Sequence, residues 1–274
     1  MKLIVFTKLF KDKSIDELVE LAQRHGLDGF DLCIRPGHPI NPDNVSDELV
    51  NAVQRINAAG LSVPLVTGGI DLTAPDDPGA ESLLAAMEQA DVRLLKLGYF
   101  RFDPHRQDYW YEVAQIRKAL EGWQQLAERH NVRICYHTHS HRCMGLNCAA
   151  LAHLIIGLDP ARVGAYIDPG HMLVEGEEFP VGASMVKQYL AAVALKDVLL
   201  RRQDNHGHGR LSVKWVTAGQ GMVDWSAVFS ELRRLRFHGP LSVHCEFDAP
   251  PELLDETLDM EFAFFKQLRD QAQA

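Results

Sequence analysis

The sequence lacks any apolar run that approaches the roughly 20 residues a membrane-spanning helix requires. Residues 1–13, MKLIVFTKLFKDK, contain a short apolar run but not the small-residue cleavage pattern of a secretory signal peptide. We therefore interpret this segment as the first strand of the fold. Together, these two absences predict a cytoplasmic protein with no membrane partner.

Positive charge is scarce as well. The chain carries 28 Lys and Arg residues against 37 Asp and Glu residues, which gives a formal net charge of −9. Nucleic-acid backbones select a basic protein face, so this balance argues against a nucleic-acid partner.

Cysteine is present in an odd number, five, with irregular spacing. This argues against a disulfide framework and favours a reducing compartment. A zinc site made from a histidine with Cys143 and Cys148 is an alternative, although the spacing matches no familiar zinc pattern.

What the sequence does contain is a regular alternation of strand and helix patterns. Its 274 residues are 46% hydrophobic and 24% charged, as in ordinary soluble proteins. Eight helical patterns alternate with eight strand-like runs, predicted at residues 2–7, 27–33, 61–66, 92–97, 132–137, 163–167, 191–196 and 241–245. This order predicts a parallel sheet closed into a single-domain (β/α)8 TIM barrel over residues 1–274, with a long polar segment at 199–219.

A doubly wound open sheet is the alternative fold. Such sheets usually carry a glycine-rich first turn, and residues 7–12 contain no glycine. In a barrel, the site lies where the strands end at their carboxyl side. Polar and ionisable side chains gather at these predicted strand ends: Thr7, Lys8, Asp31, Arg35, Thr67, Lys96, Tyr99, Arg101, His137, His139, Asp168, His171, Lys196, Asp197, His244 and Glu246.

The stretch VRICYHTHSH at residues 132–141 is the clearest sign of a site. Side chains alternate faces along a strand, so His137 and His139 are predicted to point the same way. Imidazole is the commonest metal ligand in proteins. Hydrogen-bonded histidines at a strand end are the simpler alternative.

Other strand ends add metal-type ligands. Asp168 and His171 are separated by a Pro-Gly turn, Asp197 follows the seventh strand, and His244 and Glu246 share one face of the eighth. A mixed set of imidazoles and carboxylates suits one Mn, Zn, Co or Fe ion better than Mg or Ca. Two structural alternatives stay open: Asp168 as a helix N-cap, and Glu246 in a salt bridge across the barrel mouth.

These motifs give the chain a family resemblance. The sequences DPGHM at 168–172, LKD at 195–197 and GQGMVDW at 219–225 together resemble the xylose isomerase-like superfamily. That superfamily includes sugar phosphate isomerases and epimerases, tagatose- and psicose-type 3-epimerases, hydroxypyruvate isomerase and inosose dehydratases. The resemblance covers nearly the whole chain and is strongest between residues 136 and 246.

The resemblance implies one divalent ion held by two Glu, an Asp and a His. The Asp falls on Asp168 with His171 as its companion, the first Glu falls on His137, and the second falls on His244. The family's His falls on Ala194, so this sequence departs from the pattern there. We predict a metal set of His137, Asp168, His244 and Glu246, with His139 in reserve.

A second way to replace the missing ligand lies in the polar segment. His206 or His208 would have to fold over the barrel mouth, and a solvated loop is the alternative for both. For catalysis we predict His171, Lys196 and His139, with Lys196 stabilising a developing oxyanion. Substrate contacts are predicted for Arg35, Arg101 and Asp197, with further candidates Arg201, Arg202, Trp110 and Trp215.

The resemblance implies a metal-dependent isomerase or epimerase that abstracts a proton next to the carbonyl of a sugar or keto-polyol. Alternatives are a dehydratase of a keto-sugar or keto-inositol, which the His-Thr-His strand end favours, a metal-dependent endonuclease-like hydrolase, and a non-catalytic sugar-binding barrel. The expected partner is a small sugar-like molecule. A homo-oligomer, dimer or tetramer, is also expected.

Overall fold

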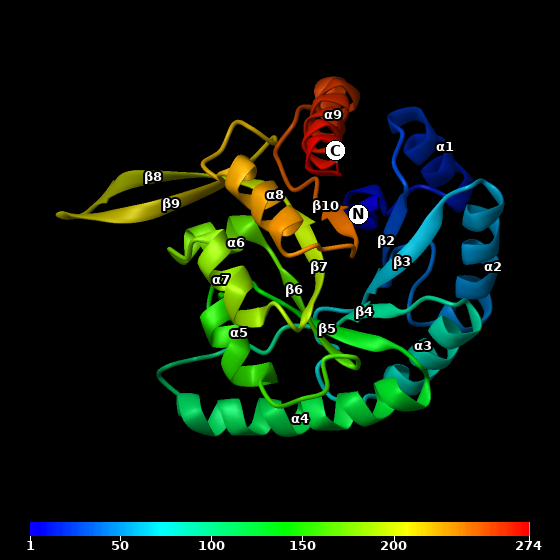
Figure 1. Cartoon of the computed structure of the whole chain (residues 1–274), viewed down its shortest axis with the longest axis horizontal. Helices are drawn as coiled ribbons and strands as arrows, with labels where there is room; N and C mark the ends of the chain where they lie inside the picture. The colour runs from blue at the N-terminus through cyan, green and yellow to red at the C-terminus, as the bar shows by residue number, and fades with distance from the viewer. Residues whose placement is uncertain (274) are drawn as a thin grey trace.

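The computed structural model describes residues 1–273 and forms a closed barrel of parallel strands (Figure 1). Each barrel strand pairs in parallel with its neighbours in the order β1-β10-β7-β6-β5-β4-β3-β2. These strands are β1 (Leu3–Phe6), β2 (Gly29–Cys33), β3 (Ser62–Thr67), β4 (Leu94–Lys96), β5 (Arg133–His137), β6 (Val163–Ile167), β7 (Leu190–Leu195) and β10 (Leu241–Val243). The predicted single-domain (β/α)8 barrel is confirmed.

Helices connect the strands and cover the outside of the barrel (Figure 1). They are α1 (Ile15–His25), α2 (Val45–Ala58), α3 (Pro78–Gln89), α4 (Tyr109–Arg129), α5 (Cys148–Ile155), α6 (Pro169–Val174), α7 (Phe179–Val186), α8 (Trp225–Arg234) and α9 (Leu254–Gln273), with short 3-10 turns η1 (Thr7–Phe10) and η2 (Pro251–Leu253). Helix α1 begins at a capping box of Ser14 and Glu17, and Gly26 ends it at a φ of 63°.

The apolar core has two layers because strand side chains alternate faces. Most buried residues lie between the barrel and its helices. A smaller cluster that includes Ile4, Leu65, Tyr166 and Ala194 forms the second layer, inside the barrel. Ala194 lies on β7, and Lys196 directly follows the end of that strand at Leu195.

The polar segment at 199–219 folds into an antiparallel hairpin rather than a loop. Its strands are β8 (Asp197–Asn205) and β9 (His208–Val216), and they pair over their whole length. Figure 1 shows the hairpin extending away from the barrel. This corrects the expectation that His206 or His208 folds over the mouth: both are exposed at the hairpin's turn.

The short helix α6 begins directly after β6, as the N-cap alternative for Asp168 implies, although the Pro169-Gly170 sequence is also typical of a simple turn. Proline is well tolerated in the first turn of a helix. No helix within residues 1–273 is long and apolar enough to cross a membrane.

Candidate active site

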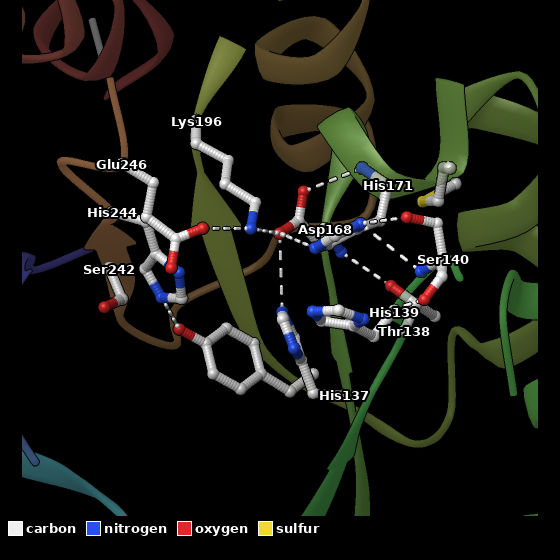
Figure 2. Close-up of polar contacts among 12 residues, drawn as sticks. His137, Thr138, His139, Ser140, Asp168, His171, Lys196, Ser242, His244 and Glu246 are labelled. Carbon is white, nitrogen blue, oxygen red and sulfur yellow. Dashed lines mark hydrogen bonds and ion pairs between the residues drawn. The ribbon is translucent and has the colours of Figure 1, made fainter. Parts of the chain in front are cut away.

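Seven predicted site residues come together where the barrel strands end (Figure 2). They are supplied by the ends of β5, β6, β7 and β10 and by α6: His137, His139, Asp168, His171, Lys196, His244 and Glu246. All are buried except His139 and Glu246, which are partly exposed. The barrel rule thus placed these side chains correctly from sequence.

Asp168 lies at the centre of the site. Its Oδ1 accepts a hydrogen bond from the backbone N–H of His171 at 3.0 Å, so the N-cap role is confirmed. Its Oδ2 faces three nitrogen atoms: Lys196 Nζ at 3.4 Å, His137 Nε2 at 3.5 Å and His171 Nε2 at 3.9 Å. Oδ2 and both imidazole nitrogens form no regular hydrogen bond within the described chain.

Lys196 is a buried cation between two carboxylates. Its Nζ lies 2.7 Å from Glu246 Oε2 and above the ring of Trp215, 4.3 Å from the centroid. Burial alone would lower the pKa of Lys196, but Asp168 and Glu246 outweigh burial and hold the pKa above its usual value. Lys196 therefore stays charged at neutral pH.

Glu246 takes part in a salt bridge across the barrel mouth, as the structural alternative predicted. Lys8 Nζ lies 2.6 Å from Oε1, and Lys196 occupies the other oxygen. Burial would raise the pKa of Glu246, but Lys196, His244 and Lys8 together lower this pKa well below its ordinary range. The carboxylate is ionised and already paired on both oxygens.

The hydrogen bonds of His171 and His139 assign their neutral tautomers. The backbone N–H of Ser140 donates to His171 Nδ1 at 3.3 Å, so the ring proton of His171 lies on Nε2, which faces Asp168. His139 Nδ1 lies 2.8 Å from the carbonyl oxygen of Ser140, which can only accept. The proton of His139 therefore lies on Nδ1, and its Nε2 keeps a lone pair.

Both rings stay neutral at neutral pH. Their centroids lie 4.0 Å apart. Burial, followed by the charge of Lys196, lowers the pKa of His139 to about 4 and lowers the pKa of His171 well below its ordinary value. The site therefore presents one unprotonated nitrogen and one N–H group on neighbouring imidazoles.

His137 is oriented by Tyr99, whose hydroxyl lies 3.0 Å from Nδ1. If this hydroxyl donates, the proton of His137 lies on Nε2 and points at the Asp168 carboxylate, which is the electrostatically favourable arrangement. Lys96 Nζ lies 3.7 Å from the centroid of the Tyr99 ring. Burial and then the charge of Arg35 lower the pKa of Lys96 well below its ordinary value.

His244 belongs to a second buried chain of polar groups. Its Nε2 lies 2.8 Å from the hydroxyl of Tyr166, which donates to Asp31 Oδ2 at 3.3 Å. Asp31 also accepts hydrogen bonds from Thr67 and Ser242. Burial raises the pKa of Asp31 to about 6 despite these bonds. This chain holds His244 toward Tyr166 rather than toward Asp168.

The donor atoms do not fit the divalent ion that the resemblance implies. Among residues 1–273, no group of three or more His, Cys, Asp or Glu side chains is arranged to hold a metal. Glu246 carries a lysine on each oxygen, His244 Nε2 pairs with Tyr166, and Ala194 supplies a methyl group where the family has a ligand. The four predicted ligands are neighbours but do not form a coordination shell.

The predicted substrate contacts are more scattered. Arg35 donates to the carbonyl of Gly68 and lines a hollow of about 520 Å³ between the loops after β2 and β3, with Ile70 and Asp71. Arg101 lies exposed and donates to the His141 carbonyl. Neither residue contacts Asp168 or Lys196 in the structure, so both lie around the catalytic cluster rather than in it.

Asp197, predicted as a substrate contact, has a structural role in the fold. It is buried and accepts five hydrogen bonds, from the backbone of Val198 and from the loop and helix that follow the hairpin: Gly219, Gly221, Val223 and the indole of Trp225. Both oxygens are used, which leaves little capacity for a substrate. Arg201 and Arg202 are exposed on the hairpin, and Trp110 is exposed on α4.

Two further residues of the site were missed from sequence. Ser140 aligns His139 and His171, and its Oγ lies 2.8 Å from His171 Nδ1. The pattern at residues 163–167 indicates only a strand, but Tyr166 precedes Asp168 by two residues, so the two side chains share a face. That spacing is the signal that identifies it.

The fold and motifs agree with comparisons to known proteins. Residues 19–267 match the family described as xylose isomerase-like TIM barrel. An inosose dehydratase from Lacticaseibacillus casei is 25% identical over 181 residues, which cover 62% of this chain. The match spans only 59% of the length of that relative.

Solved structures share the fold at low identity. The 3-keto-D-glucoside 4-epimerase from E. coli superposes with a TM-score of 0.73 at 18% identity, covering 98% of this chain and 99% of the other. D-psicose 3-epimerase from Clostridium cellulolyticum H10 gives 0.74 at 13% identity, with the same coverage. The relative with the matching sequence is a dehydratase, and both solved structures are sugar epimerases. The chain belongs to the xylose isomerase-like TIM barrel family.

Proposed function

We propose that the protein is a sugar isomerase or epimerase that moves a proton on the carbon next to the carbonyl of a sugar or keto-polyol. One observation carries the proposal. A buried ammonium group, a buried carboxylate and imidazoles with both kinds of nitrogen converge where the barrel strands end. These are the groups that such a proton transfer needs: a base, an acid and a fixed positive charge.

Lys196 supplies the positive charge. Removing a proton next to a carbonyl places negative charge on the carbonyl oxygen, and a fixed cation in a water-poor site stabilises that charge most effectively. Lys196 is held by Glu246 and faces Asp168, so it does not have to reorganise during the reaction. A carbonyl oxygen beside Nζ would accept a charge-assisted hydrogen bond.

His139 and His171 are the proposed proton carriers. His139 is partly exposed, and its Nε2 lone pair is suited to accept the proton from carbon. His171 carries its proton on Nε2 and is suited to donate. The two rings, whose centroids lie 4.0 Å apart, would divide the roles of base and acid between them. Asp168 stabilises an imidazole that becomes positively charged.

The rest of the substrate would extend from this cluster toward Arg35. The hollow of about 520 Å³ beside Arg35 is large enough for a sugar-sized molecule. Arg35 presents a cation there, stacked 5.7 Å from the Phe6 ring centroid. Arg101 lies on another side of the mouth, over Tyr99. We propose both as contacts for the polar groups of the substrate.

Dehydration is the second candidate. The similarity to an inosose dehydratase favours it, as does the N–H group of His171, which could protonate a leaving hydroxyl. Both reactions begin with the same proton abstraction and differ in the second step. An endonuclease-like hydrolase that needs several metal ions is disfavoured by the lysine-paired carboxylate of Glu246.

Product analysis distinguishes these candidates. The protein is incubated with D-fructose, D-tagatose, D-psicose and keto-inositols, and products are identified by NMR and chromatography. An isomerase gives an isomer of equal mass, whereas a dehydratase gives a product lighter by one water. If neither appears with any of these carbonyl compounds, and none of them binds, the proposed function is wrong.

The remaining parts of the proposal concern the cell and the assembly. We propose a cytoplasmic enzyme with a small sugar-like substrate that works as a homo-oligomer, dimer or tetramer. The protruding hairpin supports the oligomer, because an isolated two-stranded sheet is only marginally stable in water. Light scattering of the purified protein tests the oligomeric state.

A further inference from the structure

We propose that the ammonium group of Lys196 takes the place of the divalent metal ion that the family resemblance implies, so that this enzyme works without a metal. The catalytic part of this inference rests on the proposed function. The structural part, that a lysine excludes the ion, rests only on the geometry of the site.

The position of Lys196 is the first argument. Its Nζ lies 2.7 Å from Glu246 Oε2 and 3.4 Å from Asp168 Oδ2, between the carboxylates that follow β10 and β6 (Figure 2). A metal bound by these same oxygens would lie about 2.0–2.2 Å from each. The ion and the ammonium group would then compete for one small space, and their positive charges would repel each other.

The charge balance of the site is the second argument. Asp168 and Glu246 contribute two negative charges, and Lys196 and Lys8 contribute two positive charges. A divalent ion would add two uncompensated positive charges to a buried site, which is unfavourable unless ligands neutralise them. The lysines already perform that neutralisation.

The missing and occupied ligands are the third argument. Ala194 is buried near the end of β7 and precedes Lys196 by two residues, so a methyl group takes the position where the resemblance implies a histidine. His171 presents an N–H group to Asp168, because its Nδ1 accepts from the Ser140 backbone. A protonated ring nitrogen cannot coordinate a metal. Loss of the ligand at position 194 therefore leaves Lys196, two residues further along the chain, as the cation between the two carboxylates.

The consequence is an electrophile that the polypeptide itself supplies. An ammonium group has three donors: Glu246 accepts a hydrogen bond from one of them, and Asp168 lies opposite as an ion-pair partner at 3.4 Å. The third remains for the carbonyl oxygen of the substrate, on the side flanked by Trp215. Lys196 then stabilises the oxyanion by a hydrogen bond and by its charge.

Metal binding in the absence of turnover tests the structural part. The wild-type chain is dialysed against a chelator and titrated with MnCl2 and ZnCl2, and binding is followed by calorimetry and thermal unfolding. In a separate measurement, the metal content of untreated protein is determined by elemental analysis. We expect a content far below one ion per chain and no shift in the unfolding temperature. One tightly held ion per chain, released by Asp168→Asn, would overturn the inference.

Two variants isolate the lysine. Ala194→His restores a ligand but keeps Lys196, and should still bind no metal. Ala194→His combined with Lys196→Gln removes the competing charge, and should bind Zn²⁺ and raise the unfolding temperature. If the folded double variant binds no better than Ala194→His, exclusion by Lys196 is wrong. If the double variant does not fold, Lys196→Gln alone is compared with wild type in the same titration.

Activity tests the catalytic part separately. With the substrate identified by product analysis, turnover should be unchanged by the chelator and by added Mn²⁺. Turnover that disappears with the chelator and returns with the metal would overturn the inference while leaving the proposed function intact. Conversely, a chain that neither binds metal nor turns over any carbonyl sugar would contradict the proposed function and leave the structural part standing.

Discussion

Single side chains decide the chemistry of this site. Asp168 caps α6 with one oxygen and faces three nitrogen atoms with the other. Small differences in hydrogen bonding give neighbouring histidines opposite tautomers: Ser140 donates to His171 through its N–H and accepts from His139 through its carbonyl. Ser140 thereby determines which ring could act as the proposed base and which as the proposed acid.

Lys196→Met should lower kcat strongly. Removing one preorganised charge that stabilises an oxyanion typically costs about 10²–10³-fold in kcat. We expect the larger change in kcat rather than KM, because the charge on the oxygen develops during the reaction. Steady-state kinetics on the identified substrate measure this, with circular dichroism as the folding control. Lys196→Arg should keep part of the activity, and equal kcat for wild type and Lys196→Met would contradict the assigned role.

Glu261 should make the stability of the protein depend on pH. It is buried on α9, and burial raises its pKa from 4.5 to about 8. Below the pKa of 4.5 in the unfolded chain, Glu261 is protonated in both the folded and the unfolded state. Between this value and the pKa of about 8 in the folded chain, only the folded state keeps the proton. The free energy of unfolding therefore falls as pH rises, by at most about 1.4 kcal/mol per pH unit.

The variant Glu261→Gln removes this titration. Its unfolding free energy, measured with urea at several pH values between about 5 and 8, should fall less steeply than that of wild type. The variant should therefore gain stability relative to wild type as pH rises. Parallel profiles for the two proteins would show that Glu261 does not titrate in this range.

At the scale of elements, the attachment of the β8–β9 hairpin to the barrel depends on a few buried contacts. The hairpin of β8 and β9 leaves the barrel directly after Lys196, and its base returns Trp215 to the site, where the ring contacts both Lys196 and His171. Asp197 ties the beginning of the hairpin to the loop and helix that follow it. The base of the hairpin is thus anchored to the active site.

Asp197→Ala should destabilise the fold. Five hydrogen bonds to a buried carboxylate are lost, and several N–H groups lose their partner, which should cost about 3 kcal/mol or more. Chemical denaturation measures the loss. Asp204→Ala, on the exposed part of the same strand, is the matched control and should change stability by about 0.5 kcal/mol or less. Equal effects of the two variants would refute the anchoring role.

The molecule as a whole was predictable to the extent that its elements follow a repeating pattern. Buried parallel strands are continuous apolar runs, so the barrel and most strand-end residues follow from sequence. The hairpin does not, because exposure on both faces leaves residues such as Arg201, Arg202 and Gln203 without an apolar alternation. The partners of individual side chains are harder still to predict: nothing local in the sequence indicates that Lys196 contacts Glu246, 50 residues away.

The hairpin also bears on the assembly. Its exposed Arg201, Arg202, Arg210 and Lys214 carry positive charge on a chain with a net charge of −9, and Leu211 is 53% exposed. These features suit contact with an acidic face of a second copy. Replacing residues 202–210 with a short turn should lower the molar mass in solution, measured by light scattering, to that of a monomer. An unchanged mass would exclude the hairpin as the assembly contact.

Exchange of a carbon-bound proton with solvent tests the central claim most directly. The protein is incubated in D2O with the keto sugars and keto-inositols named above, and the signal of the hydrogen next to the carbonyl is followed by NMR. The wild-type protein should replace that hydrogen with deuterium. In Lys196→Met the rate of exchange should be lower by a factor of about 10² or more. Failure of the wild-type protein to exchange it in any of these compounds would contradict proton transfer as the function of this barrel.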